Sequence, residues 1–234
     1  MIESSLVSGP RVHSADPPPF RLLVFDWDGT LMDSVASILA CTQAAIRDTG
    51  LGNMPDERIR HTIGLGMREA IETLYPGCGE VRFHQIIDRY RDHWYSTYRD
   101  RPVLFPGVSE MLARLLSRGY LLAVATGKSR RGLEQALAQS GVGGCFVVTR
   151  TADEARSKPH PQMLLDILDE LGIAAGSALM VGDSTHDLRM ARSAGTPSIA
   201  VCNGSETRAE LVSLGPLACL EKVVELPDWL TRPR

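Results

Sequence analysis

The chain has 234 residues, of which 44% are hydrophobic, with a formal net charge of −3 and a pI of about 6.1. This length fits one large domain or a domain with an insertion, and the hydrophobic fraction is sufficient for a core. The acidic balance argues against nucleic acid as the main partner, and no apolar run is long enough to span a membrane.

The N-terminal segment, residues 1–19, contains Ser, Gly, Asp and the run Pro17-Pro18-Pro19, and it lacks the apolar core of a signal peptide. We therefore expect a flexible tail there. The five cysteines have no C-x-x-C spacing, which argues against a zinc site or a disulfide framework and fits a reducing cytoplasm. The sequence leaves open whether the chain is a monomer or a homodimer.

The first informative segment joins an apolar run to a pair of acids. Leu22-Leu23-Val24-Phe25 predicts a short strand buried on both faces, and Asp26-Trp27-Asp28-Gly29-Thr30-Leu31 follows it directly. Ligands of an open parallel sheet bind just outside the carboxyl ends of its strands. Asp26 and Asp28 would therefore stand at a reaction site, where one carboxylate attacks and the other handles a proton. The alternative is an ordinary turn, which Asp and Gly also favour.

The next part of the chain has helical periodicity and no convincing strand, which indicates a helical module inserted after the first strand. We expect a core of residues 20–34 and 104–234 and a helical cap of residues 35–103. The predicted cap helices are Val35–Thr49, Asp56–Thr62, Met67–Leu74 and Val81–Arg99.

Beyond the predicted cap, helices and strands alternate, which predicts an α/β fold with a Rossmann-like parallel sheet. The expected strands are Tyr120–Ala125, Cys145–Thr149, Ala178–Val181 and Ile199–Cys202. The expected helices are Val108–Arg118, Ser129–Ser140, His160–Leu171 and His186–Ala194.

Three further polar segments lie near the ends of these strands. They are Thr126-Gly127-Lys128-Ser129, Ser157-Lys158-Pro159 and Gly182-Asp183-Ser184-Thr185-His186-Asp187. Each has an ordinary structural explanation, respectively a helix N-cap, a proline-rich helix start and a turn before a helix. Together with the first segment, they place two acids, a threonine, a lysine and two further acids, in this order along the chain, near the ends of predicted strands. Lys128 and Lys158 are also two of only three lysines in the chain, which hints at a need for a compact ammonium.

The four segments, in this order, resemble the haloacid dehalogenase superfamily of phosphatases and phosphotransferases, over residues 20 to about 225. Within it, Asp33-Ser34 and Ile63-Gly64-Leu65-Gly66 resemble the phosphoglycolate-phosphatase-like enzymes. The resemblance implies a Rossmann-like core with an inserted helical cap. It also implies Mg²⁺-dependent hydrolysis of a small phosphorylated metabolite, with 2-phosphoglycolate as a candidate.

The resemblance also assigns roles to individual residues. Asp26 would form an aspartyl-phosphate, Asp28 would act as acid and then base, and Thr126 and Lys158 would complete the catalytic set. The implied phosphate-binding residues are Asp26, Trp27, Asp28, Thr126, Gly127 and Lys158. The implied Mg²⁺ site comprises Asp26, Asp28 through its main-chain carbonyl, Asp183 and Asp187. In the cap, Gly64, Gly66 and Arg68 would form a substrate loop.

Several alternatives share this scaffold. Asp28 argues against a dehalogenase, whose halide leaves without a proton. The phosphonoacetaldehyde-hydrolysing branch needs a cap lysine, and residues 35–105 contain none. A sugar-phosphate mutase resembling beta-phosphoglucomutase, or a pyrophosphatase, would keep every core motif. A catalytically silent binding module is the alternative outside enzymes, since a fold does not imply a function.

Overall fold

The computed structural model of the chain describes residues 20–98 and 104–232, and it centres on a parallel sheet of six strands. The predicted tail and the predicted cap boundary at residue 103 lie outside these ranges. The strand order is β3-β2-β1-β4-β5-β6, with every neighbouring pair parallel. In sequence order, the strands are Leu22–Phe25, Leu121–Thr126, Val148–Thr151, Ala178–Gly182, Ser198–Val201 and Ala218–Leu220.

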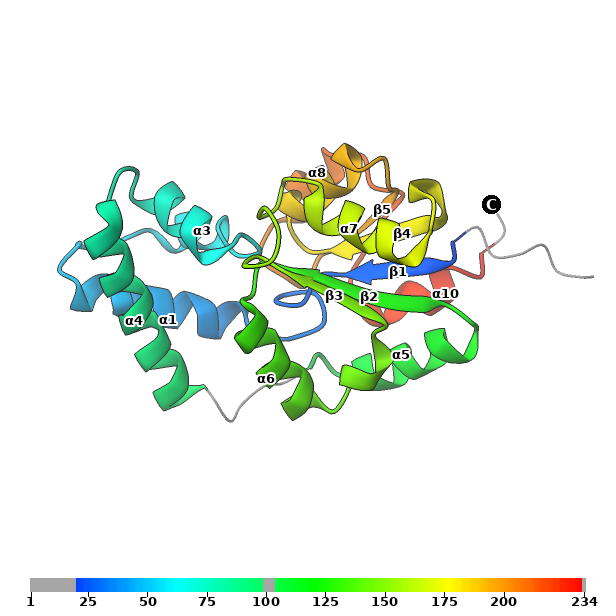
Figure 1. Cartoon of the computed structure of the whole chain (residues 1–234), viewed down its shortest axis with the longest axis horizontal. Coiled ribbons are helices and arrows are strands. Elements are labelled where there is room, and N and C mark those ends of the chain that lie inside the picture. The colour runs from blue at the N-terminus through cyan, green and yellow to red at the C-terminus, as the bar shows by residue number, and fades with distance from the viewer. Residues whose placement is uncertain (1–19, 99–103, 233–234) are drawn as a thin grey trace, which may run out of the picture.

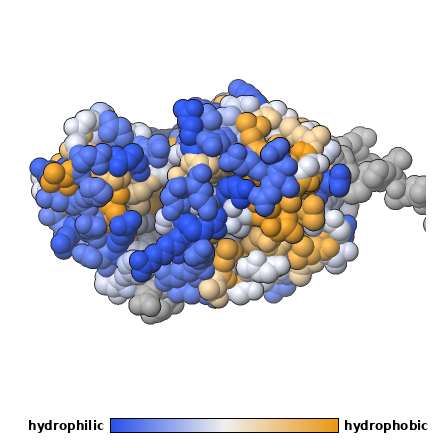
Figure 2. All heavy atoms as spheres, in the orientation of Figure 1, coloured by the Kyte–Doolittle hydropathy of each residue, from blue (hydrophilic) through white to orange (hydrophobic). Residues whose placement is uncertain are grey.

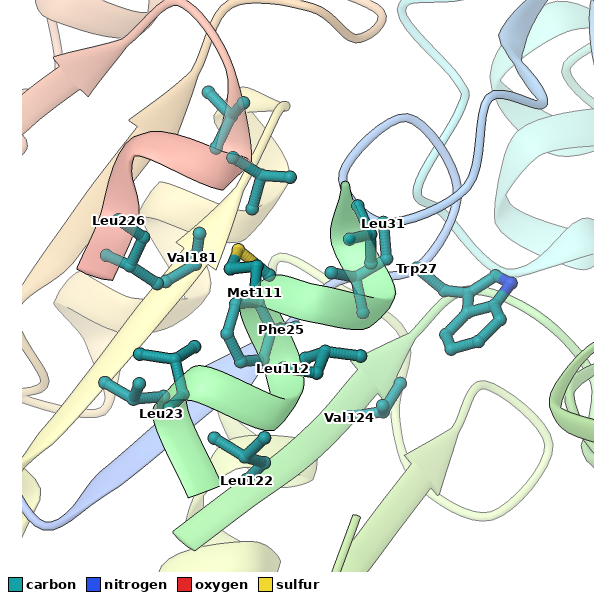
Figure 3. Packing of buried hydrophobic residues seen from close by; sticks show 14 of the residues in the cluster. Leu23, Phe25, Trp27, Leu31, Met111, Leu112, Leu122, Val124, Val181 and Leu226 are labelled. Carbon is teal, nitrogen blue, oxygen red and sulfur yellow. The ribbon is translucent and has the colours of Figure 1, made fainter. Parts of the chain in front are cut away.

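Alternation along β1 explains why its four apolar residues are all buried. Leu23 and Phe25 belong to one apolar cluster and Leu22 and Val24 to another, because successive side chains of a strand point to opposite faces. Figure 3 shows Leu23 and Phe25 packed with side chains that include Met111. Both faces of the sheet must therefore be covered by helices.

Figure 1 shows these helices on the two sides of the sheet. Helices α5 (Val108–Ser117), α6 (Arg130–Ser140) and α10 (Leu226–Trp229) contribute to the first cluster. Helices α7 (Gln162–Leu171) and α8 (Thr185–Ser193) contribute to the second. This arrangement confirms the predicted α/β fold with a Rossmann-like parallel sheet.

The strand order places a topological switch at β1, which lies between β2 and β4. Connections leave this point in opposite directions, so a crevice opens outside the carboxyl ends of the two halves. The residues that follow β1, β2 and β4 are those of the predicted reaction site.

Four helices lie to one side of the sheet, on the left of Figure 1, and we call them the cap. They are α1 (Val35–Asp48), α2 (Asp56–Arg60), α3 (Met67–Leu74) and α4 (Gly79–Thr97). Two small clusters of their own hold them together, the larger formed by Ala45, Ile71, Phe83, Ile86 and Ile87. Hydrophilic residues cover much of the visible cap surface, whereas hydrophobic residues gather on the core side (Figure 2).

Some predicted bounds differ from the structure. The predicted strand Cys145–Thr149 is observed as Val148–Thr151, because Gly143–Cys145 forms a 3₁₀ turn. The helix predicted from His160 begins at Gln162, after Pro161. Strand β6 and the short helices α9 (Arg208–Val212) and α10 are not predicted from the sequence, because they are too brief to show periodicity.

Helix α4 is long but does not have the composition of a membrane-spanning helix. It begins at Gly79, two residues before the predicted start, and the predicted end at Arg99 lies outside the described residues. Across residues 20–98 and 104–232, no helix combines the length and the apolar character required to cross a bilayer.

Candidate active site

The strand ends bring the predicted acids together. Asp26 directly follows β1, and its N–H donates to the carbonyl of Val181 at 2.9 Å, which extends the β1–β4 pairing by one residue. Asp183 follows the end of β4. The two acids therefore emerge from adjacent parallel strands at the same edge of the sheet, as the sequence predicts.

Asp187 joins them from the first turn of α8. Ser184 caps this helix, since its Oγ accepts from the N–H of Asp187 while the Asp187 carboxylate accepts from the N–H of Ser184. One carboxylate oxygen from each of Asp26, Asp183 and Asp187 lies within 4.8 Å of the others, and all three residues are buried. The capping box thus fixes the third acid of a compact cluster.

Lys158 is the cation inside this cluster. Its Nζ lies 2.5 Å from Asp26 Oδ1 and 2.7 Å from Asp187 Oδ1, and its side chain is fully buried. Burial alone would lower the pKa of Lys158, but the charges of Asp187 and Asp26 outweigh that effect and raise it. Lys158 is therefore a permanent positive charge between two acids.

One ammonium does not compensate three buried acids. Burial raises the pKa of Asp26 well above its usual value, and the charges of Asp187 and Asp183 add to the rise, while Lys158 opposes it. Burial and the charge of Asp187 raise the pKa of Asp183 to about 6. Among the described residues, Asp26 Oδ2 has no hydrogen-bond partner although it is buried. The cluster therefore has the character of a cation site made of carboxylate oxygens.

Asp183 is oriented by groups from two different loops. Thr30 Oγ1 donates to Asp183 Oδ1 at 2.8 Å, and the N–H and Oγ of Ser205 donate to Oδ2 at 2.8 and 3.0 Å. A Cβ at Gly29 would overlap the Asp183 carboxylate, so this position requires glycine. Ser205 is not predicted from the sequence, where its only signal is the turn Asn203-Gly204-Ser205 after β5.

Asp28 lies in a separate polar group. Its two carboxylate oxygens are 2.8 and 2.9 Å from Lys128 Nζ, and Ser34 Oγ donates to Oδ1 at 2.6 Å. Both partners of the ion pair are largely buried. The role of Lys128 is not predicted from the sequence, where the rarity of lysine in this chain is the available signal. The predicted contact of the Asp28 main-chain carbonyl with a metal remains a prediction.

The segment after β2 meets the predicted loop of the cap. Thr126 is buried, and its Oγ1 accepts from the N–H of Lys128 at 3.2 Å. A Cβ at Gly127 would overlap the main-chain oxygens of Gly64 and Leu65. This position needs glycine because two backbones approach each other closely there.

A second contact closes the cap against the core. The N–H of Gly66 donates to Ser157 Oγ at 2.7 Å, next to Lys158. His186 Nε2 lies 2.8 Å from the carbonyl oxygen of His61 in the cap. A Cβ at Gly64 would lie 3.2 Å from Ser184 Oγ, so the predicted loop glycines lie against three of the four core segments that carry the predicted chemistry.

Two predicted site residues have side chains that are engaged in other contacts. The ring of Trp27 is fully buried in the core, where its Nε1 lies 3.2 Å from Met32 Sδ (Figure 3). Arg68 pairs with Glu80 at 2.8 Å, with its guanidinium 4.1 Å from the centre of the Phe83 ring. Trp27 could therefore bind phosphate only through its main chain, and Arg68 is held on the cap surface.

Comparisons with known proteins agree with this geometry. The family model described as haloacid dehalogenase-like hydrolase matches residues 23–201. A Dickeya dadantii protein named Probable phosphatase IndB is 34% identical, over 88% of this chain and 91% of its own length. A Nitrosococcus oceani protein named phosphoglycolate phosphatase is 28% identical over 91% and 97%. A hydrolase from Pseudomonas syringae has a similar fold, with a TM-score of 0.82 at 22% identity, covering 91% of this chain and 98% of that one.

Proposed function

Because this chain belongs to the haloacid dehalogenase-like hydrolases, we propose that it is a phosphatase that hydrolyses small phosphomonoesters through an aspartyl-phosphate. The observation that carries the proposal is the state of Asp26. One of its carboxylate oxygens is held by Lys158, and the other is buried without a hydrogen-bond partner among the described residues. Such an oxygen is available as a nucleophile.

The acidic cluster suits Mg²⁺. Its ligands are carboxylate oxygens, which this hard cation prefers, and its three acids exceed the one ammonium among them. Asp26, Asp183 and Asp187 would hold the ion, with the main-chain carbonyl of Asp28 as the further predicted ligand. When bound, Mg²⁺ would supply positive charge to the phosphoryl oxygens and to the acids themselves.

Attack by Asp26 on a phosphate must overcome charge repulsion. At ~4 Å and an effective dielectric constant of about 20, charges of −1 and −2 repel by roughly 8 kcal/mol. Lys158 offsets part of this repulsion from beside Asp26. The Thr126 hydroxyl and the N–H of Gly127 would hold the phosphoryl oxygens at the N-terminal end of α6.

Asp28 would move the protons of both steps. In the first step, the bond between phosphorus and the leaving oxygen breaks as Asp26 Oδ2 bonds to phosphorus, and Asp28 protonates the leaving oxygen. In the second, Asp28 takes a proton from water, which attacks phosphorus and releases Asp26. Ser34 and Lys128 fix the orientation of the Asp28 carboxylate for these transfers.

The cap would choose the substrate and exclude water. The loop 62–66 lies against Gly127 and Ser157, so a substrate reaching Asp26 must be enclosed between cap and core. Relatives named phosphoglycolate phosphatase make 2-phosphoglycolate a substrate to test.

The test is phosphate release from a panel of phosphomonoesters with and without Mg²⁺. The panel includes 2-phosphoglycolate, hexose phosphates, nucleotides and pyrophosphate. We expect Mg²⁺-dependent release that Asp26→Asn abolishes and that Asp33→Asn, the same change at an exposed acid nearby, retains. Phosphate that moves within a hexose phosphate without release would instead identify a mutase, and release from pyrophosphate alone a pyrophosphatase.

A further inference from the structure

A large cavity lies where the cap meets the core. Its volume is about 480 Å³, and its lining includes Asp28 and Lys128 from the core and Ile38, Leu65 and Trp94 from the cap. This volume falls in the range of roughly 300–1,000 Å³ that is typical of pockets for drug-sized ligands. The phosphate ester of a two-carbon hydroxy acid would fill only a small part of this cavity.

The cap side of the cavity is mainly aliphatic and aromatic. Helix α4 contributes Tyr90 and Trp94, whose rings are stacked with centres 6.2 Å apart and planes inclined by 17°. Lys128 Nζ lies 5.1 Å from the centre of the Trp94 ring, so the aromatic wall reaches the ion pair that holds Asp28. A group on the leaving oxygen of a phosphomonoester would extend from Asp28 along this wall.

The charges around the cavity are balanced, and its cations already have partners. Its described lining includes the cations Arg68, Arg91 and Lys128 and the acids Asp28, Glu69 and Asp153. Arg68 pairs with Glu80, Arg91 with Asp88 and Lys128 with Asp28. A second negative charge on the substrate would therefore meet no unpaired cation among the described lining residues.

Tyr90 supplies an uncharged polar group in the same wall. Burial and the charge of Asp28 raise the pKa of its hydroxyl well above the usual value, so the hydroxyl is protonated. A partly buried tyrosine of this kind offers both an apolar ring face and a neutral hydrogen-bonding group. This combination suits a planar group with few polar atoms.

Building on the proposed phosphatase activity, we propose that the cavity binds phosphomonoesters whose alcohol carries an uncharged planar ring. It would bind them in preference to phosphate esters that carry a carboxylate, such as 2-phosphoglycolate. The ring lies against Trp94 and Tyr90, and the phosphoryl group reaches Asp26 past the Asp28–Lys128 pair. Stacking on an aromatic side chain favours a planar ring over an alkyl group. We expect a preference of about tenfold or more, which corresponds to roughly 1.4 kcal/mol or more.

The test compares benzyl phosphate, ethyl phosphate and 2-phosphoglycolate with Mg²⁺ present. Benzyl and ethyl phosphate have the same charge and similar leaving groups, so the ring is the main difference. We expect kcat/KM for benzyl phosphate to exceed both others by about tenfold. Equal values, or a higher value for 2-phosphoglycolate, would overturn the proposal while the phosphatase activity stands.

Variants of Trp94 test the location of the ring. Trp94→Ala should lower the ratio of kcat/KM between benzyl and ethyl phosphate by about tenfold, whereas Trp94→Phe should keep most of it. Val81→Ala changes an exposed residue of the same helix outside the cavity, and it should leave the ratio as it is. A ratio unchanged in Trp94→Ala would contradict the placement.

Calorimetric binding separates this proposal from the proposed function. If the wild-type protein releases phosphate from none of the three esters and from no member of the wider panel, the phosphatase proposal fails. Tighter binding of benzyl than of ethyl phosphate to Asp26→Asn would still support the ring pocket in that case, and equal binding would overturn it as well.

Discussion

Lys158→Met is the substitution that most directly tests the electrostatics of the acidic cluster. The ammonium lies 2.5 Å from Asp26 and 2.7 Å from Asp187 in a fully buried site. At an effective dielectric constant of about 20, each contact corresponds to about 6 kcal/mol of gross attraction, offset by the cost of burying the ammonium. Methionine fills a similar volume but leaves the acids without their cation.

Removing one partner of a buried pair costs about 3–5 kcal/mol, since the remaining charge stays buried. For a domain of this size, we expect Tm to fall by roughly 6–20 °C near pH 7.5 without metal. The loss should shrink near pH 5, because Asp183, whose pKa is raised to about 6, is then protonated and the cluster carries less negative charge. Urea or thermal unfolding at the two pH values measures both effects.

Two further variants complete the test of Lys158. Lys222→Met makes the same change at an exposed lysine and should leave Tm nearly unchanged. The double variant Lys158→Met/Asp187→Asn should recover part of the lost stability without recovering activity. If Lys158→Met unfolds at the wild-type temperature at both pH values, the account of a cation between buried acids is wrong.

Three other predictions follow from the site geometry. Lys128→Ala removes the ion pair that holds Asp28, and we expect kcat to fall by about ten- to a hundredfold. Thermal stabilisation by Mg²⁺ should persist in this variant, and an equal loss of both would point to misfolding. Because the pKa of Asp183 is raised to about 6, the free energy of unfolding of the metal-free protein should fall by about 3 kcal/mol as the pH rises from about 4 through 6. Added Mg²⁺ should therefore raise Tm more near pH 7.5 than near pH 5, and an equal rise would argue against binding at this acid. Gly127→Ala would push the backbone against Gly64 and Leu65, and we expect phosphate release to fall well below that of Gly144→Ala, whose added Cβ meets no atom within 4 Å.

The sequence predicted the sheet because its core strands are continuous apolar runs. Leu22–Phe25 and Ala178–Gly182 lie at the centre of the sheet, and burial on both faces makes their patterns unmistakable. The edge strands were less predictable. Val148–Thr151 contains Thr149 and Arg150, and Ala218–Leu220 has only three residues, so neither has a distinct apolar pattern.

Much of the acidic cluster could also be predicted, because strand ends position side chains directly. Asp26 and Asp183 follow adjacent strands, and a helix cap fixes Asp187. Contacts between loops could not be predicted in this way. The bonds from Ser205 to Asp183, and from Lys128 to Asp28, depend on tertiary placement that no local pattern specifies.

In the cap too, the sequence predicts the helices but not the contacts that would select the substrate. Its helices follow from periodicity, and Gly64 and Gly66 lie near the core as the motif suggested. Arg68, however, pairs with Glu80 twelve residues away, and the cavity wall arises from Trp94 meeting Lys128. Such pairings across the cap and the core decide which substrate groups fit, and they appear only in three dimensions.

The most direct test of the central claim is to look for a phosphoryl group on Asp26. The protein would be mixed with a turned-over phosphomonoester and Mg²⁺, quenched in acid within one turnover, digested and analysed by mass spectrometry. We predict one added phosphoryl group on the peptide that contains Asp26. With an ester whose leaving group departs without a proton, such as 4-nitrophenyl phosphate, we predict more of it in Asp28→Asn, because that variant then lacks only the base for the second step. Turnover with no phosphorylated Asp26 in either protein would contradict the account.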